Sequence, residues 1–402
     1  MRIQRLLGSL AIAALAGGSA APAFAQEEPA TRQAVIEQEQ AQKVPLLHPY
    51  VPGQAEALMN RAETLLVKGV KWHPFFSNAY SGGRFALGVG YAKALSAYNI
   101  LDFRGSYSIA GYKRIETEFR APRLFNRRGA LIMLGGWREA TQVGFFGLGP
   151  NSAVDNRTNY LFRQPYGQAT LTVFPTRRAF MLRGGLEFTK WTQLPGQGSY
   201  PSVETKYTPA TLPGLGADPT YVHSQGTFGF DWRPSPGYAR RGGSYTITFH
   251  DYNDPDKAFG FQLVDYEAIQ HIPILREAWV ISLRGLASTA VDKGGQQIPF
   301  FMLPSLGGGS NLRGYDSWRY RDKNSVLVQA EWRVMVNRFV DMVFFYDTGK
   351  VVARRSELSL DDLKHDYGFG MRFHGPLSTP FRVEVAKSPE KLALIFATTA
   401  VF

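Results

Sequence analysis

The chain has 402 residues, 13% of them aromatic and 41 of them glycine, and carries a formal net charge of +12 at pH 7. It contains no cysteine, which excludes stabilisation by disulfide bonds. Beyond residue 25, no apolar run reaches the roughly 18 residues of a membrane-spanning helix, which excludes a protein that crosses a membrane with helices. Two classes remain: a soluble exported domain, and a membrane β-barrel, whose strands need only about 9–11 residues each.

Residues 1–25 have the three parts of a secretory signal peptide. Arg2 and Arg5 stand before a short apolar run, and an Ala-Phe-Ala cleavage site ends at Ala25. We therefore expect an exported protein whose mature chain begins at Gln26. Export argues against nucleic acid as the partner of the basic excess and favours phosphate-bearing lipid or a basic lumen.

Residues 26–80 are expected to form a mostly polar periplasmic leader. One helix is predicted near residues 54–67, where Leu58, Leu65 and Leu66 give only a narrow apolar stripe. In a barrel protein, this leader would either plug the lumen, lie on the periplasmic mouth or remain a mobile tail.

Residues 81–402 alternate between apolar and polar side chains with the period of two that is typical of β-strands. Near residue 100, for example, Leu101 and Phe103 face one side while Asp102 and Arg104 face the other. Fifteen strands are predicted, near residues 84–95, 99–110, 112–122, 129–146, 158–174, 180–193, 221–233, 244–253, 259–272, 278–288, 325–336, 340–351, 366–374, 380–387 and 391–402. A weaker strand near residues 67–79 would give the even number that single-chain bacterial barrels prefer.

The number and similarity of these segments favour an all-β fold, a transmembrane antiparallel β-barrel of about 16 strands, over a soluble sandwich. Short turns alternate with long loops, and barrels of this kind place the short turns in the periplasm and the long loops outside the cell. The last predicted strand has Phe396 and Phe402 on its lipid-facing side. Its aromatic end resembles the terminal recognition strand of outer-membrane barrels, so the expected location is the bacterial outer membrane.

The long connection at residues 289–324 carries the stretch Leu312-Arg313-Gly314-Tyr315. Here the sequence resembles the BamA/TamA superfamily of outer-membrane barrels, also called the bacterial surface antigen family. The resemblance is strongest over residues 300–402 and weaker over the rest of the predicted barrel. Its signature is an arginine-glycine-aromatic triplet on a loop that folds back into the barrel, and leucine stands here where valine is usual. The resemblance implies that Arg313 meets acidic residues on the next two strands, and Glu331 and Asp347 occupy the corresponding places.

Alternation along the strands agrees with this assignment. Val328 and Trp332 are expected to face lipid, so Glu331 faces the lumen, where an unpaired Asp347 would also be costly. Closing a loop of this length costs roughly 3 kcal/mol of chain entropy. An exposed ion pair returns only about 0–1 kcal/mol, whereas a guanidinium shared by two carboxylates in a partly dry lumen could hold the loop. Gly314 would let the backbone approach the wall, and Tyr315 would cover the pair.

The resemblance implies a barrel that assists the insertion or translocation of proteins, or of lipids, through a lateral seam steadied by the lumen loop. Unfolded client proteins and outer-membrane lipids are the expected partners. Family members that handle proteins carry periplasmic POTRA modules ahead of the barrel. The leader is shorter than one such module and lacks its pattern, so a periplasmic partner protein is expected to replace them.

Two other functions stay open. The basic excess would suit a passive or anion-favouring pore. An outer-membrane hydrolase is the third candidate, because His250 stands beside Asp251 among seven histidines. However, no nucleophile elbow, HExxH motif or metal-ligand spacing is present, so we expect neither an enzyme nor a bound metal or cofactor, and His250 is expected to be a polar residue of the rim or lumen.

Overall fold

The computed structural model describes residues 32–43, 53–63, 71–176, 179–398 and 400–402, so the predicted signal peptide lies outside the described residues. Helix α1 (Arg32–Lys43) belongs to one compact unit, residues 1–52. Helix α2 (Gln54–Glu63), within the segment for which a helix is predicted, belongs with all strands to a second unit, residues 53–402. Within the described ranges, neither the length nor the apolar character of any helix is sufficient to span a membrane.

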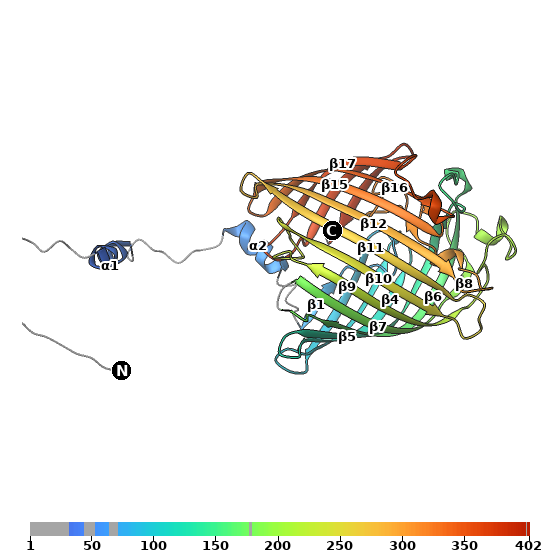
Figure 1. Ribbon diagram of the computed structural model, residues 1–402, viewed down its shortest axis with the longest axis horizontal. Coiled ribbons are helices and arrows are strands. Elements are labelled where there is room, and N and C mark those ends of the chain that lie inside the picture. Colours follow the sequence, from blue (N-terminus) through green and yellow to red (C-terminus); the bar gives the residue numbers. More distant parts are fainter. Residues whose placement is uncertain (1–31, 44–52, 64–70, 177–178, 399) are drawn as a thin grey trace, which may run out of the picture. The chain divides into compact units, whose positions relative to one another are not determined.

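The second unit is an antiparallel sheet that curls into a barrel (Figure 1). Its wall consists of β1 (Trp72–Phe75), β2 (Ala86–Ala94), β3 (Ile100–Ser108), β4 (Lys113–Leu124), β5 (Gly129–Phe145), β6 (Thr158–Val173), β7 (Ala179–Lys190), β9 (Thr220–Asp231), β10 (Gly242–Asn253), β11 (Phe261–Ile274), β12 (Trp279–Asp292), β15 (Asn324–Asn337), β16 (Val340–Val352), β17 (Lys364–Phe373), β18 (Phe381–Lys387) and β19 (Leu392–Ala397). Each of the fifteen predicted strands overlaps one of these, and β1 lies within the weaker segment at 67–79. The predicted barrel fold is confirmed.

Three further strands are short and are not predicted by the alternation. Strand β8 (Thr192–Pro195) pairs with β6 and continues the line of β7. Strands β13 (Ser305–Leu306) and β14 (Tyr320–Arg321) pair with each other inside the connection between β12 and β15. We call this connection, residues 293–323, the lumen loop.

The ladders around the wall differ greatly in length. The ladder between β11 and β12 spans all 14 residues of each strand. By contrast, β1 pairs with β2 over 4 residues, and β19 pairs with β18 over 6. In the strand order β19 is the hydrogen-bonded neighbour of β2. The ladders of the first and last strands are thus among the shortest in the wall, and we call this part of the wall the seam.

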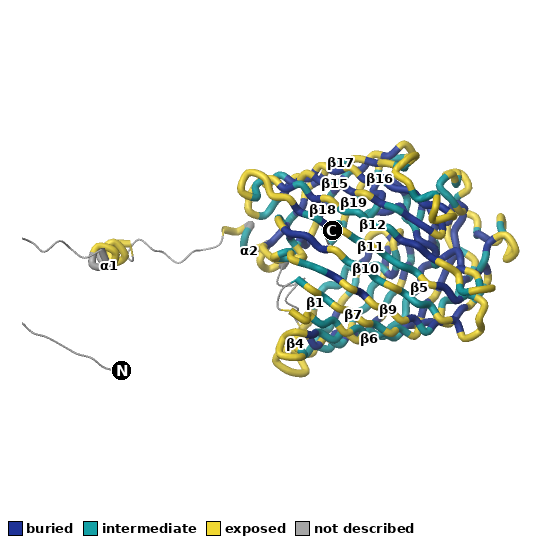
Figure 2. The backbone as a smooth tube through the Cα atoms, in the orientation of Figure 1, coloured by how far each residue is buried: buried dark blue, intermediate teal, exposed yellow. Residues whose placement is uncertain are grey.

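Side chains alternate between the lipid-facing and lumen-facing sides of the wall, and the tube in Figure 2 changes between buried and exposed along individual strands. On β3, Tyr107 is 60% exposed, whereas Asp102 is 5% exposed and faces the lumen. The lumen-facing side is polar and internally paired: Arg104 lies in hydrogen-bond contact with both Glu116 and Glu118 of β4. This pattern follows from the two different surroundings, lipid outside and a polar lumen inside.

The lumen is filled below the long loops by an apolar cluster. Phe300 of the lumen loop packs edge-on against Phe145 and Tyr160 of the wall, with ring centroids 5.0 and 4.9 Å apart. Val203 and Leu212, from the connection between β8 and β9, join the same buried cluster. Two connections that are far apart in the sequence thus form one plug on the long-loop side.

At the opposite end, the connection between β9 and β10 crosses the mouth that carries the short turns. We call residues 232–241 the strap. Gly237 forms a bridge with Ser378 in the turn between β17 and β18, several strands away along the wall. Tyr238 stacks on His374 with ring centroids 3.8 Å apart, and its hydroxyl donates to Asp341 over 2.9 Å. The sequence predicts only an ordinary short turn here.

The last strand is shorter than predicted. Strand β19 ends at Ala397, and Phe396 keeps its lipid-facing position, but Phe402 does not continue the strand. The Phe402 ring lies 6.4 Å from the ring of His271 and 6.0 Å from the guanidinium of Arg284. The register of β18 with β19 ends at Ala397, and the described residues beyond it, 398 and 400–402, belong to no strand. The Phe402 ring instead lies near lumen cations, which attract its face.

Candidate functional site

The lumen loop presents Arg313 through a tight local turn. Gly307 and Gly308 adopt φ values of +115° and +113°, which glycine tolerates best. The side-chain oxygen of Asn311 then accepts hydrogen bonds from the amides of Gly307 and Leu312, each over 2.7 Å. The Leu312 side chain is buried in an apolar cluster with Leu306, Tyr315, Tyr320, Leu327 and Val351. These contacts fix the direction in which Arg313 leaves the loop.

Arg313 bridges the loop to two wall strands. Its Nε and Nη2 donate to the two carboxylate oxygens of Asp347 over 2.6 and 2.7 Å, a bidentate contact. Its Nη1 donates to Glu331 over 2.8 Å, and the side chains of all three residues are fully buried. Charge-assisted bidentate bonds of this kind are among the strongest in proteins. The structure thus places both predicted acidic residues, one on β15 and one on β16, on the same guanidinium.

A wider set of charges surrounds this pair. Glu384 of β18 lies 3.4 Å from Nη1 of Arg313. Arg372 of β17 bridges Glu331 and Glu384, at 3.2 Å from the latter. The buried charged groups joined by these ion pairs are the arginines Arg313, Arg333, Arg372 and Arg382 and the acids Glu331, Asp347 and Glu384. Contact between opposite charges reduces the cost of burying them.

Arg313 stays charged in this setting. Burial alone lowers the pKa of its guanidinium, but the attraction of Asp347, and then of Glu331 and Glu384, outweighs burial, so the pKa lies above its ordinary value. Removing one member of such a buried network leaves the others uncompensated, which typically costs about 3–5 kcal/mol. The loop and the wall therefore depend on each other: Arg313 needs its acidic partners in place, and the acids need Arg313.

Gly314 allows the loop to touch the wall. A Cβ atom at this position would come within 2.7 Å of the Cβ of Asp366 on β17 and within 3.0 Å of the Cβ of Ser388. Any side chain here would push the loop away from the strands that carry the acidic partners. The loop and the wall are thus in direct backbone contact at Gly314.

The aromatic cover of the guanidinium is Phe345, not Tyr315 as the sequence predicts. The Phe345 ring centroid lies 3.5 Å from the Cζ atom of Arg313, and the side chain is buried. Tyr315 instead donates its hydroxyl to the carbonyl of His365 over 3.2 Å and packs with Leu312. Phe345 shares its side of β16 with Asp347, so alternation alone could have identified it.

Among the described residues, no group of three or more histidines, cysteines, aspartates or glutamates is arranged to hold a metal ion. The histidine cluster of the lumen is hydrogen-bonded internally: His223 lies 2.9 Å from Glu187 and 3.0 Å from His250. In turn, His250 lies 3.3 Å from Asp265.

The structure thus has three features in common with barrels of the transmembrane type: the barrel itself, a loop folded into its lumen, and a buried arginine on that loop that binds carboxylates of the wall. The model of the Omp85 superfamily domain matches residues 75–392, almost the whole barrel. The chain belongs to the Omp85 superfamily. The family resemblance found in the sequence is confirmed, and this Omp85 barrel is an outer-membrane protein.

Solved structures agree with this fold. BamA from Haemophilus ducreyi lacking POTRA domains 1-3 is 16% identical, with a TM-score of 0.57, over 81% of this chain and 68% of that one. CdiB from Escherichia coli is 12% identical, with a TM-score of 0.54, over 79% of this chain and 59% of that one. No curated protein sequence matches the chain.

Proposed function

We propose that this Omp85 barrel assists the insertion or translocation of proteins, or of lipids, into or across the outer membrane by opening its seam. The observation that carries the proposal is the weak seam beside a firmly held lumen loop. Client strands would pair with the exposed edge of β19, as in other β-augmentation. The network around Arg313 would keep the neighbouring strands in place while the seam opens.

The seam has the features of a strand edge that can be recruited. Strand β1 has only four residues and contains Pro74, which lacks an amide hydrogen and so weakens any ladder on its side. On β19, Leu392, Leu394 and Phe396 are exposed towards lipid. Once the seam opens, a strand at its edge would offer unpaired backbone groups to an incoming chain.

The occupied lumen argues against the alternative, a passive or anion-favouring pore. The aromatic plug fills the long-loop side, the Arg313 network the middle, and the strap crosses the short-turn mouth. A conducting path would have to pass all three. The wall, rather than the lumen, is the more easily opened route.

We further propose that a periplasmic partner protein delivers clients to this seam. Helix α2 is tied to the short-turn side of the barrel, because Arg338, between β15 and β16, lies 3.5 Å from Glu56. A partner that binds near α2 would be placed close to the periplasmic ends of the strands.

Site-specific photo-crosslinking in cells tests the proposal. A benzophenone side chain at Leu394, on the seam, is expected to capture unfolded outer-membrane or secreted proteins during export. The same group at Leu283, which also faces lipid but lies in the middle of a long ladder, is the matched control. Equal capture at both positions, or none at Leu394, would refute a client-accepting seam.

A further inference from the structure

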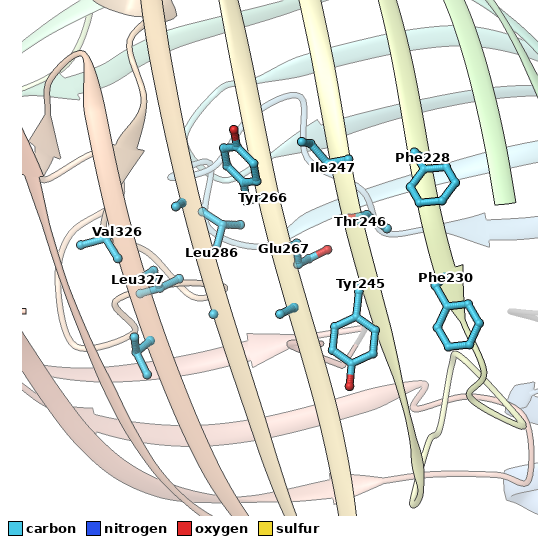
Figure 3. Close-up of a pocket in the computed structure, with 14 residues that line it drawn as sticks. Phe228, Phe230, Tyr245, Thr246, Ile247, Tyr266, Glu267, Leu286, Val326 and Leu327 are labelled. Carbon is cyan, nitrogen blue, oxygen red and sulfur yellow. The ribbon is translucent and has the colours of Figure 1, made fainter. Parts of the chain in front are cut away.

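A hollow lies on the lipid-facing side of the wall, far from the seam. It has a volume of about 500 Å³ and is bounded by β9, β10, β11, β12 and β15 (Figure 3). That volume is within the roughly 300–1,000 Å³ range of small-molecule sites. Phe228, Phe230 and Tyr245 form one side, and Val326 lies on the other (Figure 3). Val328 also lines the hollow.

Small residues create the hollow. Tyr266 is exposed towards lipid, so Ala268, two residues further along β11, faces the same way. Gly285 is the register partner of Ala268, and Ala287 is that of Tyr266, which puts both on the outer surface. A Cβ atom on Gly285 would meet nothing within 4 Å. Ala268, Gly285 and Ala287 form the floor of the hollow, and aromatic and β-branched side chains form its sides. Membrane lipid must fill the space that these small residues leave.

The depth of the hollow places it at the level of acyl chains. Trp232, Trp279 and Trp332 are exposed on the outside of the wall, near the short turns of the same strands. Trp279 and Trp332 contact each other edge-on, with ring centroids 5.4 Å apart. Tryptophan prefers the membrane–water interface, so these residues mark the periplasmic boundary of the hydrocarbon region. The hollow lies further along the strands, inside that boundary.

Basic side chains lie at the short-turn end of the strands that form the hollow. Arg241 precedes β10 and is 64% exposed, and its Nε is 3.6 Å from Glu277, a weak surface pair. Arg276 is exposed in the adjacent turn between β11 and β12. Both arginines are therefore at the depth of phospholipid headgroups in the periplasmic leaflet.

We propose that the hollow is a binding site for an anionic phospholipid, with one acyl chain in the hollow and the phosphate-bearing headgroup at Arg241 and Arg276. A flat wall touches an acyl chain along one side only, whereas the sides of the open hollow add further van der Waals contacts. The arginines add selectivity for negative headgroups. Because the hollow lies opposite the seam, the bound lipid would stay in place while the seam opens.

Native mass spectrometry of the full chain in detergent tests this, with phosphatidylglycerol and phosphatidylethanolamine of identical acyl chains as probes. The wild-type protein is expected to retain one phosphatidylglycerol molecule. Gly285→Phe fills the hollow and is expected to lose this lipid. Gly184→Phe is the matched control, since Gly184 also faces lipid with nothing within 4 Å of its Cβ position but lies outside the hollow. If Gly285→Phe does not fold, Ala268→Leu, which adds a smaller side chain to the hollow, replaces it in the same measurement.

The headgroup is tested separately. The double variant Arg241→Gln/Arg276→Gln is expected to reduce the preference for phosphatidylglycerol over phosphatidylethanolamine by roughly tenfold, because each basic residue near the surface favours anionic lipid. Retention of phosphatidylglycerol by both filling variants would overturn the acyl site. An unchanged preference in the arginine variant would overturn the headgroup assignment. Dimers present in wild type and lost in Gly285→Phe would show that a second copy of the chain, not lipid, occupies the hollow.

Discussion

The α-carbon of Gly314 lies so close to Asp366 that a methyl group on it would come within 2.7 Å of the Asp366 Cβ. Gly314→Ala is therefore expected to destabilise the docked loop by about 1–3 kcal/mol, the usual cost of overpacking. Gly294→Ala is the control within the same loop, because a Cβ there meets nothing within 4 Å. Urea unfolding in detergent, followed by heat-dependent gel migration, measures the difference. Equal stability of the two variants would contradict direct contact between loop and wall.

Replacing Arg313 tests the central ion pair. Arg313→Ala leaves Asp347 buried without its cation and removes one of the arginines that contact Glu331, so it is expected to lower the free energy of unfolding by about 3–5 kcal/mol. Arg313→Lys is expected to rescue little, since an ammonium cannot form the bidentate contact with Asp347 while reaching Glu331. The control is Arg354→Ala, whose pair with Glu357 is 80% exposed on the arginine side and is expected to be worth less than about 1 kcal/mol. If Arg313→Lys has the same free energy of unfolding as the wild type, the positive charge at this position, and not the bidentate geometry of the guanidinium, stabilises the loop.

The ring of Phe345 is expected to stabilise the guanidinium directly. Phe345→Leu keeps an apolar side chain but removes the cation–π contact, which is worth about 2 kcal/mol when desolvated. Phe344→Leu on the opposite, lipid-facing side is the control, because Phe344 contacts Trp332 rather than Arg313. Protease cleavage within residues 293–323 reports how often the loop leaves the wall. We expect faster cleavage for Phe345→Leu alone.

The strap is expected to limit access to the lumen from the periplasmic mouth. The double variant Tyr238→Ala/Arg240→Ala removes the contacts with Asp341 and His374 and should free the strap. The natural chain has no cysteine, so a single Cys at the buried Ser282, close to Arg333 and the strap, reports accessibility. A bulky thiol reagent should label it several times faster in the strap variant. If the labelling rates are equal, the strap does not close this mouth.

Much of the wall could be predicted because lipid outside and a polar lumen inside impose the same alternation on every strand. That alternation correctly predicts that Glu331 faces the lumen and Trp332 faces lipid. The motif then indicates which loop residue meets the lumen acids. Local pattern is sufficient wherever a residue's position depends only on its own strand.

What the sequence does not reveal depends on contacts between distant segments. Glu384 contacts Arg313 because the loop reaches as far as β18, which strand periodicity does not specify. The strap has the sequence of an ordinary turn, since its contact with Ser378 lies across the mouth. Phe402 is predicted on the lipid-facing side because its position in the alternation suits a strand, but it has no neighbouring ladder to hold it there.

The order of the Arg313 partners along the chain has a consequence for how the barrel matures. Glu331, Asp347 and Glu384 all follow Arg313, so the loop cannot complete its contacts until the final hairpins have been laid down. Docking of the lumen loop can therefore be completed only after the C-terminal strands have paired with their correct neighbours.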